Sequence, residues 1–141
     1  MEVKQQPKMT FHGVDIVHIN FDSTKIFISD GNIQIDVETI PRVFYPANEP
    51  NHFKIIMNVS LKVSDFFNLE LLGIGNFEFE DEIEHDIKKS LVNTNAPAIM
   101  FPYIRSFITT FTANLGNPTG TLTLPVHFFN GDLEEIIEEN K

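Results

Sequence analysis

Residues 53–63 read Phe-Lys-Ile-Ile-Met-Asn-Val-Ser-Leu-Lys-Val and form the most regular pattern in the chain. Every second side chain from Phe53 to Val63 is apolar, and most of those between are polar. A period of two is typical of a half-buried β-strand, because successive side chains point to opposite faces of the sheet. The stretch therefore predicts a strand with one face in a hydrophobic core.

Weaker alternation of the same kind flanks this strand on both sides. It covers residues 11–21, 33–37 and 69–79. The apolar positions change parity near Ile16, which predicts a β-bulge there. Three prolines, Pro41, Pro46 and Pro50, predict a loop before the 53–63 strand.

After residue 79 the apolar period becomes helical. The apolar positions are Ile83, Ile87 and Leu91, then Ile104, Ile108, Phe111 and Leu115, and finally Leu133, Ile136 and Ile137. The acids at 80–82 favour a helix N-terminus, and the polar residues 93–95 predict a break after that helix. Pro102 predicts a kink or a start in the second helix, which Gly116 is expected to cap. Residues 130–132, Asn-Gly-Asp, predict the start of a last helix.

Four strands followed by helices predict an α+β fold. We expect a four-stranded antiparallel sheet that is covered on one face by helices. A chain of 141 residues fits a single domain, residues 1–141, in which the polar residues 1–9 form a flexible arm.

The composition is acidic and lacks cysteine. Ten Lys and Arg face 20 Asp and Glu, and the resulting net charge of −10 disfavours binding to nucleic acid and to anionic membranes. The absence of cysteine excludes disulfides, thiol catalysis and cysteine-based zinc sites. No apolar run marks the N-terminus, and no stretch approaches the roughly 18 apolar residues of a membrane span. We therefore expect a cytoplasmic protein without direct membrane insertion.

Phenylalanine dominates the aromatic residues, with 14 Phe, two Tyr and no Trp. Two interpretations stay open at this point. The phenylalanines form a Phe-rich core, or some of them lie at a subunit interface or in a binding groove.

The chain carries no motif for catalysis or cofactor binding. Its five histidines, His12, His18, His52, His85 and His127, include no HExxH spacing, and there is no GxSxG, P-loop or GxGxxG pattern. The acids around His85 are more typical of a solvated helix start than of a metal site. We therefore expect no catalytic residue, no metal and no cofactor, so that binding energy alone drives any action on a partner.

Two segments of the C-terminal half carry the most specific pattern. Residues 95–105 read Asn-Ala-Pro-Ala-Ile-Met-Phe-Pro-Tyr-Ile-Arg, and residues 120–128 read Gly-Thr-Leu-Thr-Leu-Pro-Val-His-Phe. They resemble the SecB family of protein-export chaperones, in which a P-x-x-L-F-P-Y-x-R helix precedes an extended segment with leucines and a Pro-Val pair. The matching residues are Pro97, Phe101, Pro102, Tyr103, Arg105, Leu122, Leu124, Pro125, Val126 and Phe128. The resemblance spans residues 9–138 and is weakest over 23–66.

The resemblance implies an ATP-independent holdase chaperone that binds unfolded polypeptides in hydrophobic grooves and keeps secretory precursors export-competent. It implies a homotetramer, built as a dimer of dimers, that passes clients to the SecA motor. Candidate groove residues are Phe27, Ile28, Leu122, Leu124, Phe128 and Ile136; candidate interface residues are Tyr103, Ile104, Phe107 and Ile108; candidate SecA-docking residues are Asp22 and Glu70. Packing within the chain's own core stays open as the alternative for Phe128, Ile136 and the interface residues.

The chain also departs from the family pattern. His18 and Asn68 stand where an acidic and an apolar docking residue are expected, and the connection between the first two strands lacks the family's usual Trp. These departures leave open a solitary SecB-like chaperone that is dedicated to one client, such as the antitoxin of a toxin–antitoxin–chaperone system. Two functions of other classes also stay open. The chain could be a lipid carrier with a Phe-rich groove, or an enzyme that depends on His85.

Overall fold

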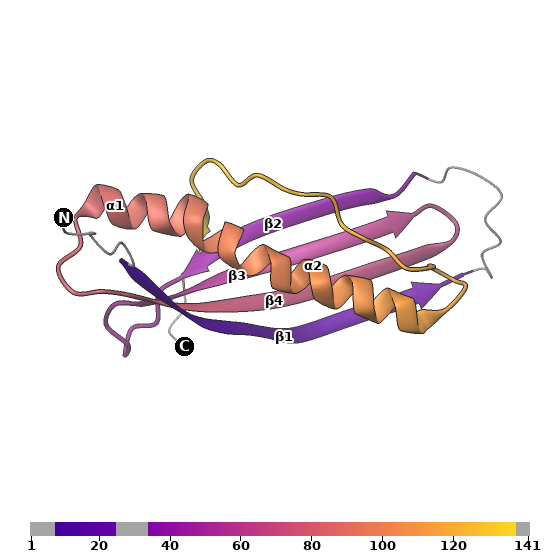
Figure 1. Cartoon of the computed structure of the whole chain (residues 1–141), viewed down its shortest axis with the longest axis horizontal. Helices are drawn as coiled ribbons and strands as arrows, with labels where there is room; N and C mark the ends of the chain where they lie inside the picture. The colour runs from indigo at the N-terminus through magenta and orange to yellow at the C-terminus, as the bar shows by residue number, and fades with distance from the viewer. Residues whose placement is uncertain (1–7, 25–33, 138–141) are drawn as a thin grey trace, which may run out of the picture.

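The computed structural model describes residues 8–24 and 34–137. Its elements are β1 (Met9–Ser23), β2 (Asp36–Phe44), β3 (His52–Val63), β4 (Phe67–Phe79), α1 (His85–Ser90), a π-helical turn (Leu91–Asn95), α2 (Ala96–Leu115) and β5 (Glu134–Glu135). Figure 1 shows the long strands side by side in one sheet, with the helices lying across one face. None of the helices in this described part is long and apolar enough to cross a membrane.

The sheet has the strand order β1-β4-β3-β2-β5. The first four strands pair antiparallel, as predicted. With the helices on one face, they confirm the α+β fold expected from the sequence. The fifth strand, β5, pairs parallel to β2 at Arg42 and Val43. It is missing from the sequence prediction because two residues are too few to show an alternating pattern.

Alternation along β3 divides the sheet into a buried face and an open face. Phe53, Ile55 and Met57 are completely buried, whereas Asn58 and Lys62 are exposed. The strand predicted from residues 53–63 is therefore confirmed. The rest of the buried face on β3 and β4 consists of Val59, Leu61, Val63, Phe67, Leu69, Leu71, Phe77 and Phe79.

Two irregularities interrupt the pairing of β1 with β4. The register shifts between Ile16 and His18, which confirms the bulge predicted near Ile16, and it shifts again between Phe11 and Gly13. Gly13 has φ of 110°, a conformation that favours glycine. Met9 belongs to β1, so the prediction of an arm is wrong for this residue, and residues 1–7 lie outside the described residues.

The prediction of a loop that begins at Pro41 is wrong, because β2 continues to Phe44. Pro41 lies opposite Met57 in the register with β3. On its other side β2 pairs with β5 only at Arg42 and Val43, so Pro41 lies on an otherwise open edge. A strand edge tolerates proline, because no neighbouring strand requires the missing N–H there.

The helical region differs from the sequence prediction at both of its expected boundaries. Glu82 has φ of 62°, which excludes it from a helix, and α1 begins at His85 rather than at residues 80–82. The break predicted at 93–95 is also wrong, because a π-helical turn joins α1 directly to α2 (Figure 1). This wider turn accommodates the polar residues without interrupting the helix. Gly116 caps α2 with φ of 84°, as predicted.

The core lies between the buried sheet face and one side of α2. Met100, Ile104 and Ile108 on this side have no exposed surface. A Cβ added to Gly73 would lie 2.9 Å from Ile104 Cδ1, and one added to Gly75 would lie 2.8 Å from Met100 Sδ. The two glycines therefore allow the helix to approach β4 closely.

The prediction of a last helix that begins at residues 130–132 is wrong. The described residues there form an extended segment and then β5. The backbone N–H of Ile136 donates to the carbonyl oxygen of Val43 at 2.8 Å. Pairing with the edge of β2 satisfies backbone groups that a helix would have satisfied internally, which overrides the weak helical period of this short segment.

We predict that Gly75→Val lowers the free energy of unfolding by about 1–3 kcal/mol, the range typical of overpacking a core. The added side chain would collide with Met100 and force α2 away from the sheet. Urea denaturation followed by circular dichroism measures the change. Ser60→Val, on the open face of β3, is the matched control and should change stability little. Equal stability of the two variants would contradict the close approach of α2.

We predict that Ile104→Ala lowers the free energy of unfolding by about 2–5 kcal/mol, as expected for an aliphatic side chain truncated in a core. Its neighbour Tyr103 is 56% exposed in the single chain, so Tyr103→Ala should change the stability of the separate subunit by no more than about 0.5 kcal/mol. Denaturation at two protein concentrations tests the alternative that Ile104 lies in a contact between subunits. If Ile104 acted mainly in a contact between subunits, its effect would depend strongly on protein concentration.

Candidate functional site

Residues 116–133, which we call the strap, run back along α2 after the helix ends (Figure 1). The backbone N–H of Leu122 donates to Thr112 Oγ1 at 2.9 Å. Nearer the start of α2, Arg105 Nε donates to the carbonyl oxygen of Leu124 at 2.6 Å. The strap is thus fastened to the helix by polar contacts that do not depend on its own secondary structure.

The C-terminal end of the strap is bonded to residues that precede α2 in the chain. The backbone N–H of Leu133 donates to Asn93 Oδ1 at 3.0 Å, and Asn93 Nδ2 donates to Asp132 Oδ1 at 3.1 Å. Asp132 also lies 3.8 Å from Lys89 Nζ. The residues that the strap contacts come earlier in the chain as the strap continues toward its C-terminal end. The strap therefore runs antiparallel to the helix.

Two apolar side chains hold the strap against the core. Leu124 is 1% exposed, and Phe129 is also buried. Phe129 packs edge-on against Phe101, with ring centroids 5.6 Å apart, and its ring centroid lies 4.5 Å from that of His127. These contacts position the residues between Leu124 and Phe129.

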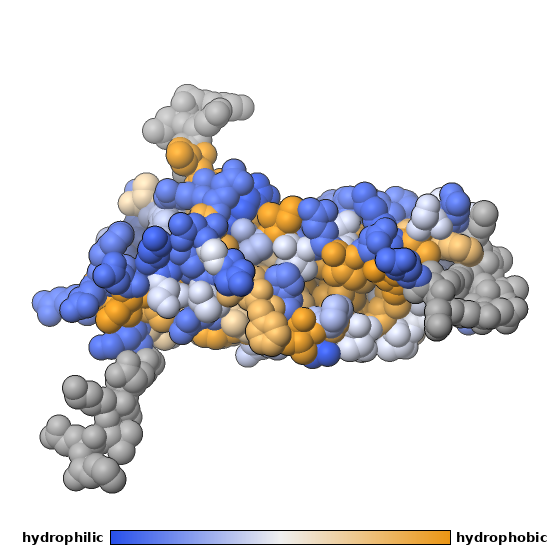
Figure 2. Space-filling view, turned by 90° about the horizontal axis from the view of Figure 1, so that it is seen from above, coloured by the Kyte–Doolittle hydropathy of each residue, from blue (hydrophilic) through white to orange (hydrophobic). Residues whose placement is uncertain are grey.

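The residues between these two anchors present apolar side chains to solvent. Val126 is 65% exposed and Phe128 is 85% exposed, and after β5 Ile137 is 80% exposed. Figure 2 shows several separate hydrophobic patches among mostly hydrophilic residues on the side of the molecule that it displays. Large apolar side chains with this much exposure are candidates for contact with another polypeptide.

The predicted groove residues separate into different environments. Phe128 is exposed, Leu122 and Ile136 are half-buried, and Leu124 lies in the core. Phe27 and Ile28 lie outside the described residues. Sequence analysis assigned no role to Val126, although it belongs to the Pro-Val pair that carries the family resemblance. A strict period of two places Leu124, Val126 and Phe128 on one side, so the pattern alone cannot separate anchor from exposed residues.

The four candidate interface residues on α2 fall on two sides of the helix. Ile104 and Ile108 are buried by the chain's own sheet. Tyr103 is exposed and Phe107 is half-buried. The ring of Tyr103 lies 5.2 Å from that of Phe11 on β1, so this exposed surface continues from α2 onto the neighbouring strand.

The candidate docking acids lie on the open face of the sheet. In the register of β1 with β4, Asp22 faces Asn68, and Glu70 is the next residue of β4 on the same face. His18 belongs to this face as well, because it pairs with Leu72. Asp22 and Glu70 are both exposed. The acids and the two positions that depart from the family pattern therefore share one surface.

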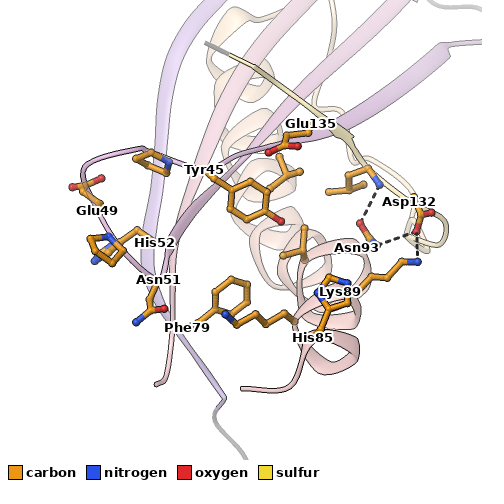
Figure 3. A pocket seen from close by; sticks show the side chains of 16 residues that line it. Tyr45, Glu49, Asn51, His52, Phe79, His85, Lys89, Asn93, Asp132 and Glu135 are labelled. Atoms are coloured by element: carbon orange, nitrogen blue, oxygen red, sulfur yellow. Dashed lines mark hydrogen bonds and ion pairs between the residues drawn. The ribbon is translucent and has the colours of Figure 1, made fainter. Parts of the chain in front are cut away.

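A pocket of about 530 Å³ opens at the other end of the molecule, where α1 meets the sheet (Figure 3). It is lined by Val43, Tyr45, Pro46, Glu49, Pro50, Asn51, His52, Phe79, His85, Lys88, Lys89, Val92, Asn93, Asp132, Leu133 and Glu135. These residues come from β2, the turn before β3, the start of β3, the end of β4, α1, the π-helical turn, the end of the strap and β5. Sequence analysis did not find this pocket, because its walls come from segments that are far apart in the chain.

Tyr45 extends into the middle of this pocket (Figure 3). Burial raises the pKa of its phenol, and the nearby carboxylate of Glu135 raises that pKa further. The hydroxyl therefore stays protonated at neutral pH, where it can donate a hydrogen bond.

The described residues offer little for metal or acid–base chemistry. Within residues 8–24 and 34–137, no group of three or more His, Asp or Glu could hold a metal ion. His85 lines the pocket, but among the described residues it has no hydrogen-bond or ion-pair partner that would orient it as a general base.

No protein-family model matches the chain. The chain is 30% identical over 145 residues to the uncharacterized protein MJ0357 of Methanocaldococcus jannaschii, which covers 99% of this chain and 94% of that protein. It is 25% identical over 154 residues to the protein-export protein SecB of Anaplasma phagocytophilum, which covers 96% of each. With the protein-export protein SecB of Orientia tsutsugamushi it shares 27% identity over 137 residues, which covers 94% of this chain and 77% of that protein.

Among solved structures, the fold is similar to the SecB-like chaperone Rv1957 of Mycobacterium tuberculosis in complex with a ChAD peptide from the Rv1956 HigA1 antitoxin. The TM-score is 0.70 at 17% identity, and the match covers 85% of this chain and 91% of that chain. At this identity the similarity establishes the fold. Together with the similarity to named SecB proteins over nearly the whole chain, it shows that this protein belongs to the SecB-like family.

Proposed function

We propose that this protein is an ATP-independent holdase chaperone that binds unfolded segments of client polypeptides on the exposed apolar surface of the strap. The observation that carries this proposal is the exposure of Phe128 and Val126 between two buried anchors. A side chain the size of Phe gains roughly 1.5–3 kcal/mol when it is removed from water. An unfolded client, which exposes apolar side chains along its length, supplies that burial without any fixed sequence.

Several weak contacts along one client strengthen its binding. Ile137, which follows β5, offers further exposed apolar surface. Contacts made by one flexible chain raise its apparent affinity, because each contact increases the local concentration of the next segment. The net charge of −10 keeps such an apolar surface soluble.

Two kinds of client fit this proposal. The SecB relatives are named protein-export proteins, which favours secretory precursors as clients. We propose that such clients would be kept export-competent and passed to SecA. The structural similarity to a SecB-like chaperone that binds an antitoxin peptide favours a single dedicated client. His18 and Asn68 stand on the open face beside Asp22 and Glu70. Because they differ from the docking residues expected there, they favour the dedicated client over SecA docking.

We further propose that the protein assembles as a homotetramer, a dimer of dimers, through the exposed side of α2. Tyr103 and Phe107 would lie in the contact, whereas Ile104 and Ile108 act within the subunit. Ile99, also exposed on α2, extends this surface. Burial of these side chains between subunits would remove apolar area that otherwise faces water.

We predict that the protein suppresses aggregation of a refolding substrate without ATP, and that Val126→Asp with Phe128→Asp weakens this suppression at least several-fold. The two carboxylates would replace the apolar surface with charged groups that bind unfolded chains poorly. Light scattering of the substrate, with the chaperone in increasing molar ratio, measures the effect.

The matched control is Val17→Asp with Ile40→Asp. Val17 and Ile40 are 53% and 44% exposed on β1 and β2, away from the strap. The control has the same change in charge and loses the same number of exposed apolar side chains. Equal loss in both double variants would contradict a specific role of the strap. If the wild-type protein suppresses no aggregation of several unrelated substrates, the general holdase is wrong and the dedicated client remains.

A further inference from the structure

The pocket beside α1 has an apolar floor and a basic side. Phe79, Val92 and Leu133 line it, with the ring of Tyr45 in the middle. Its volume of about 530 Å³ is within the range of ligand pockets and is enough for a large side chain.

Lysines from α1 form the basic side. Lys88 Nζ lies 5.2 Å from the centroid of the Phe79 ring and makes no ion pair with any residue in the described part of the chain. Lys89, in contrast, lies 3.8 Å from Asp132, which also accepts a hydrogen bond from Asn93. Lys88 is half-buried. Its charge remains free to pair with a ligand.

The acids that line the pocket are Glu49, Asp132 and Glu135, and Asp132 lies beside the lysines, where it pairs with Lys89. In Figure 3, Glu135 lies on one side of the Tyr45 ring, and His85 and Lys89 lie on the other. The Tyr45 hydroxyl, which stays protonated at neutral pH, points from the ring toward the side of Lys89. A carboxylate that enters beside Phe79 therefore meets Lys88, which no carboxylate of the described residues neutralises.

The pocket is also close to the strap along the chain. Leu133 lines the pocket and follows Phe128 by five residues, a distance of at most about 18 Å in an extended chain. A polypeptide segment of five or six extended residues is long enough to contact both places. This continuity favours a polypeptide over a free small molecule as the occupant.

We propose that this pocket binds a client segment in which a large apolar side chain stands beside a carboxylate, with the apolar side chain on Tyr45 and Phe79 and the carboxylate at Lys88. The inference deepens the proposed function, because it states which segments of a client the chaperone prefers. Clients with an acidic, aromatic segment would then be retained in preference to neutral or basic ones of equal hydrophobicity. The overall acidity of the protein alone would favour the opposite choice.

Three fluorescent peptides of equal length test this preference. Each has two phenylalanines, flanked by glutamates in the first peptide, by glutamines in the second and by lysines in the third. We expect fluorescence anisotropy to give the glutamate peptide a three- to fivefold lower Kd than the glutamine peptide, the size of one exposed ion pair. The preference should disappear in high salt, which screens such a pair. The lysine peptide should bind most weakly at the pocket.

Four variants assign the preference to the pocket. Lys88→Gln should make the glutamate and glutamine peptides bind equally, and Lys88→Arg should keep the preference. Lys62→Gln removes the same charge from the open face of the sheet and should leave the preference unchanged. Tyr45→Ala should weaken all three peptides, because it removes apolar surface and not charge.

The results distinguish this inference from the proposed function. If the peptides bind equally, or if Lys88→Gln and Lys62→Gln have equal effects, the pocket has no acidic preference, although aggregation suppression that depends on Phe128 would still support a holdase. A preference for the lysine peptide would also overturn the inference. If no peptide binds and no aggregation is suppressed, the general holdase of the proposed function is wrong.

Discussion

The close packing of α2 on β4 is the contact on which the rest of this structure depends. Gly73 and Gly75 have no side chain to keep the helix away, so Met100 and Ile104 reach the sheet directly. The helix therefore covers the apolar face of the long strands with one row of side chains. Its opposite side does not contribute to this core, and this leaves α2 with a second surface for other contacts.

The strap uses part of that second surface and takes its shape from it. It has no regular secondary structure before β5, so its backbone groups rely on partners such as Thr112, Arg105 and Asn93. Leu124 and Phe129 then bury their side chains, and this fixes the direction in which the residues between them point. Exposure of apolar side chains is normally unfavourable, and here the anchors on both sides maintain it.

Charge divides the molecule into regions with different chemistry. Acids dominate the composition and place exposed carboxylates on the open sheet face, at Asp22 and Glu70. The α1 side of the pocket carries both signs of charge, because Asp132 pairs with Lys89 while Lys88 lies over the Phe79 ring. A surface that is acidic overall, with a local basic site beside apolar side chains, can favour particular client segments while it remains soluble. Such local contrast is a property of the folded chain, since net charge carries no information about it.

The sequence by itself determines the sheet and the family. Alternation at 53–63 predicts β3, because burial on one face imposes a period of two on neighbouring residues, and the pattern in 97–105 is specific enough to indicate SecB-like proteins. Only the tertiary structure decides that Leu124 is an anchor while Phe128 is exposed, and that residues 130–137 pair with β2 rather than form a helix. The tertiary structure also decides which residues line the pocket beside α1. The physical reason is that these features depend on contacts between residues distant in the chain, which leave no periodic signal in the sequence.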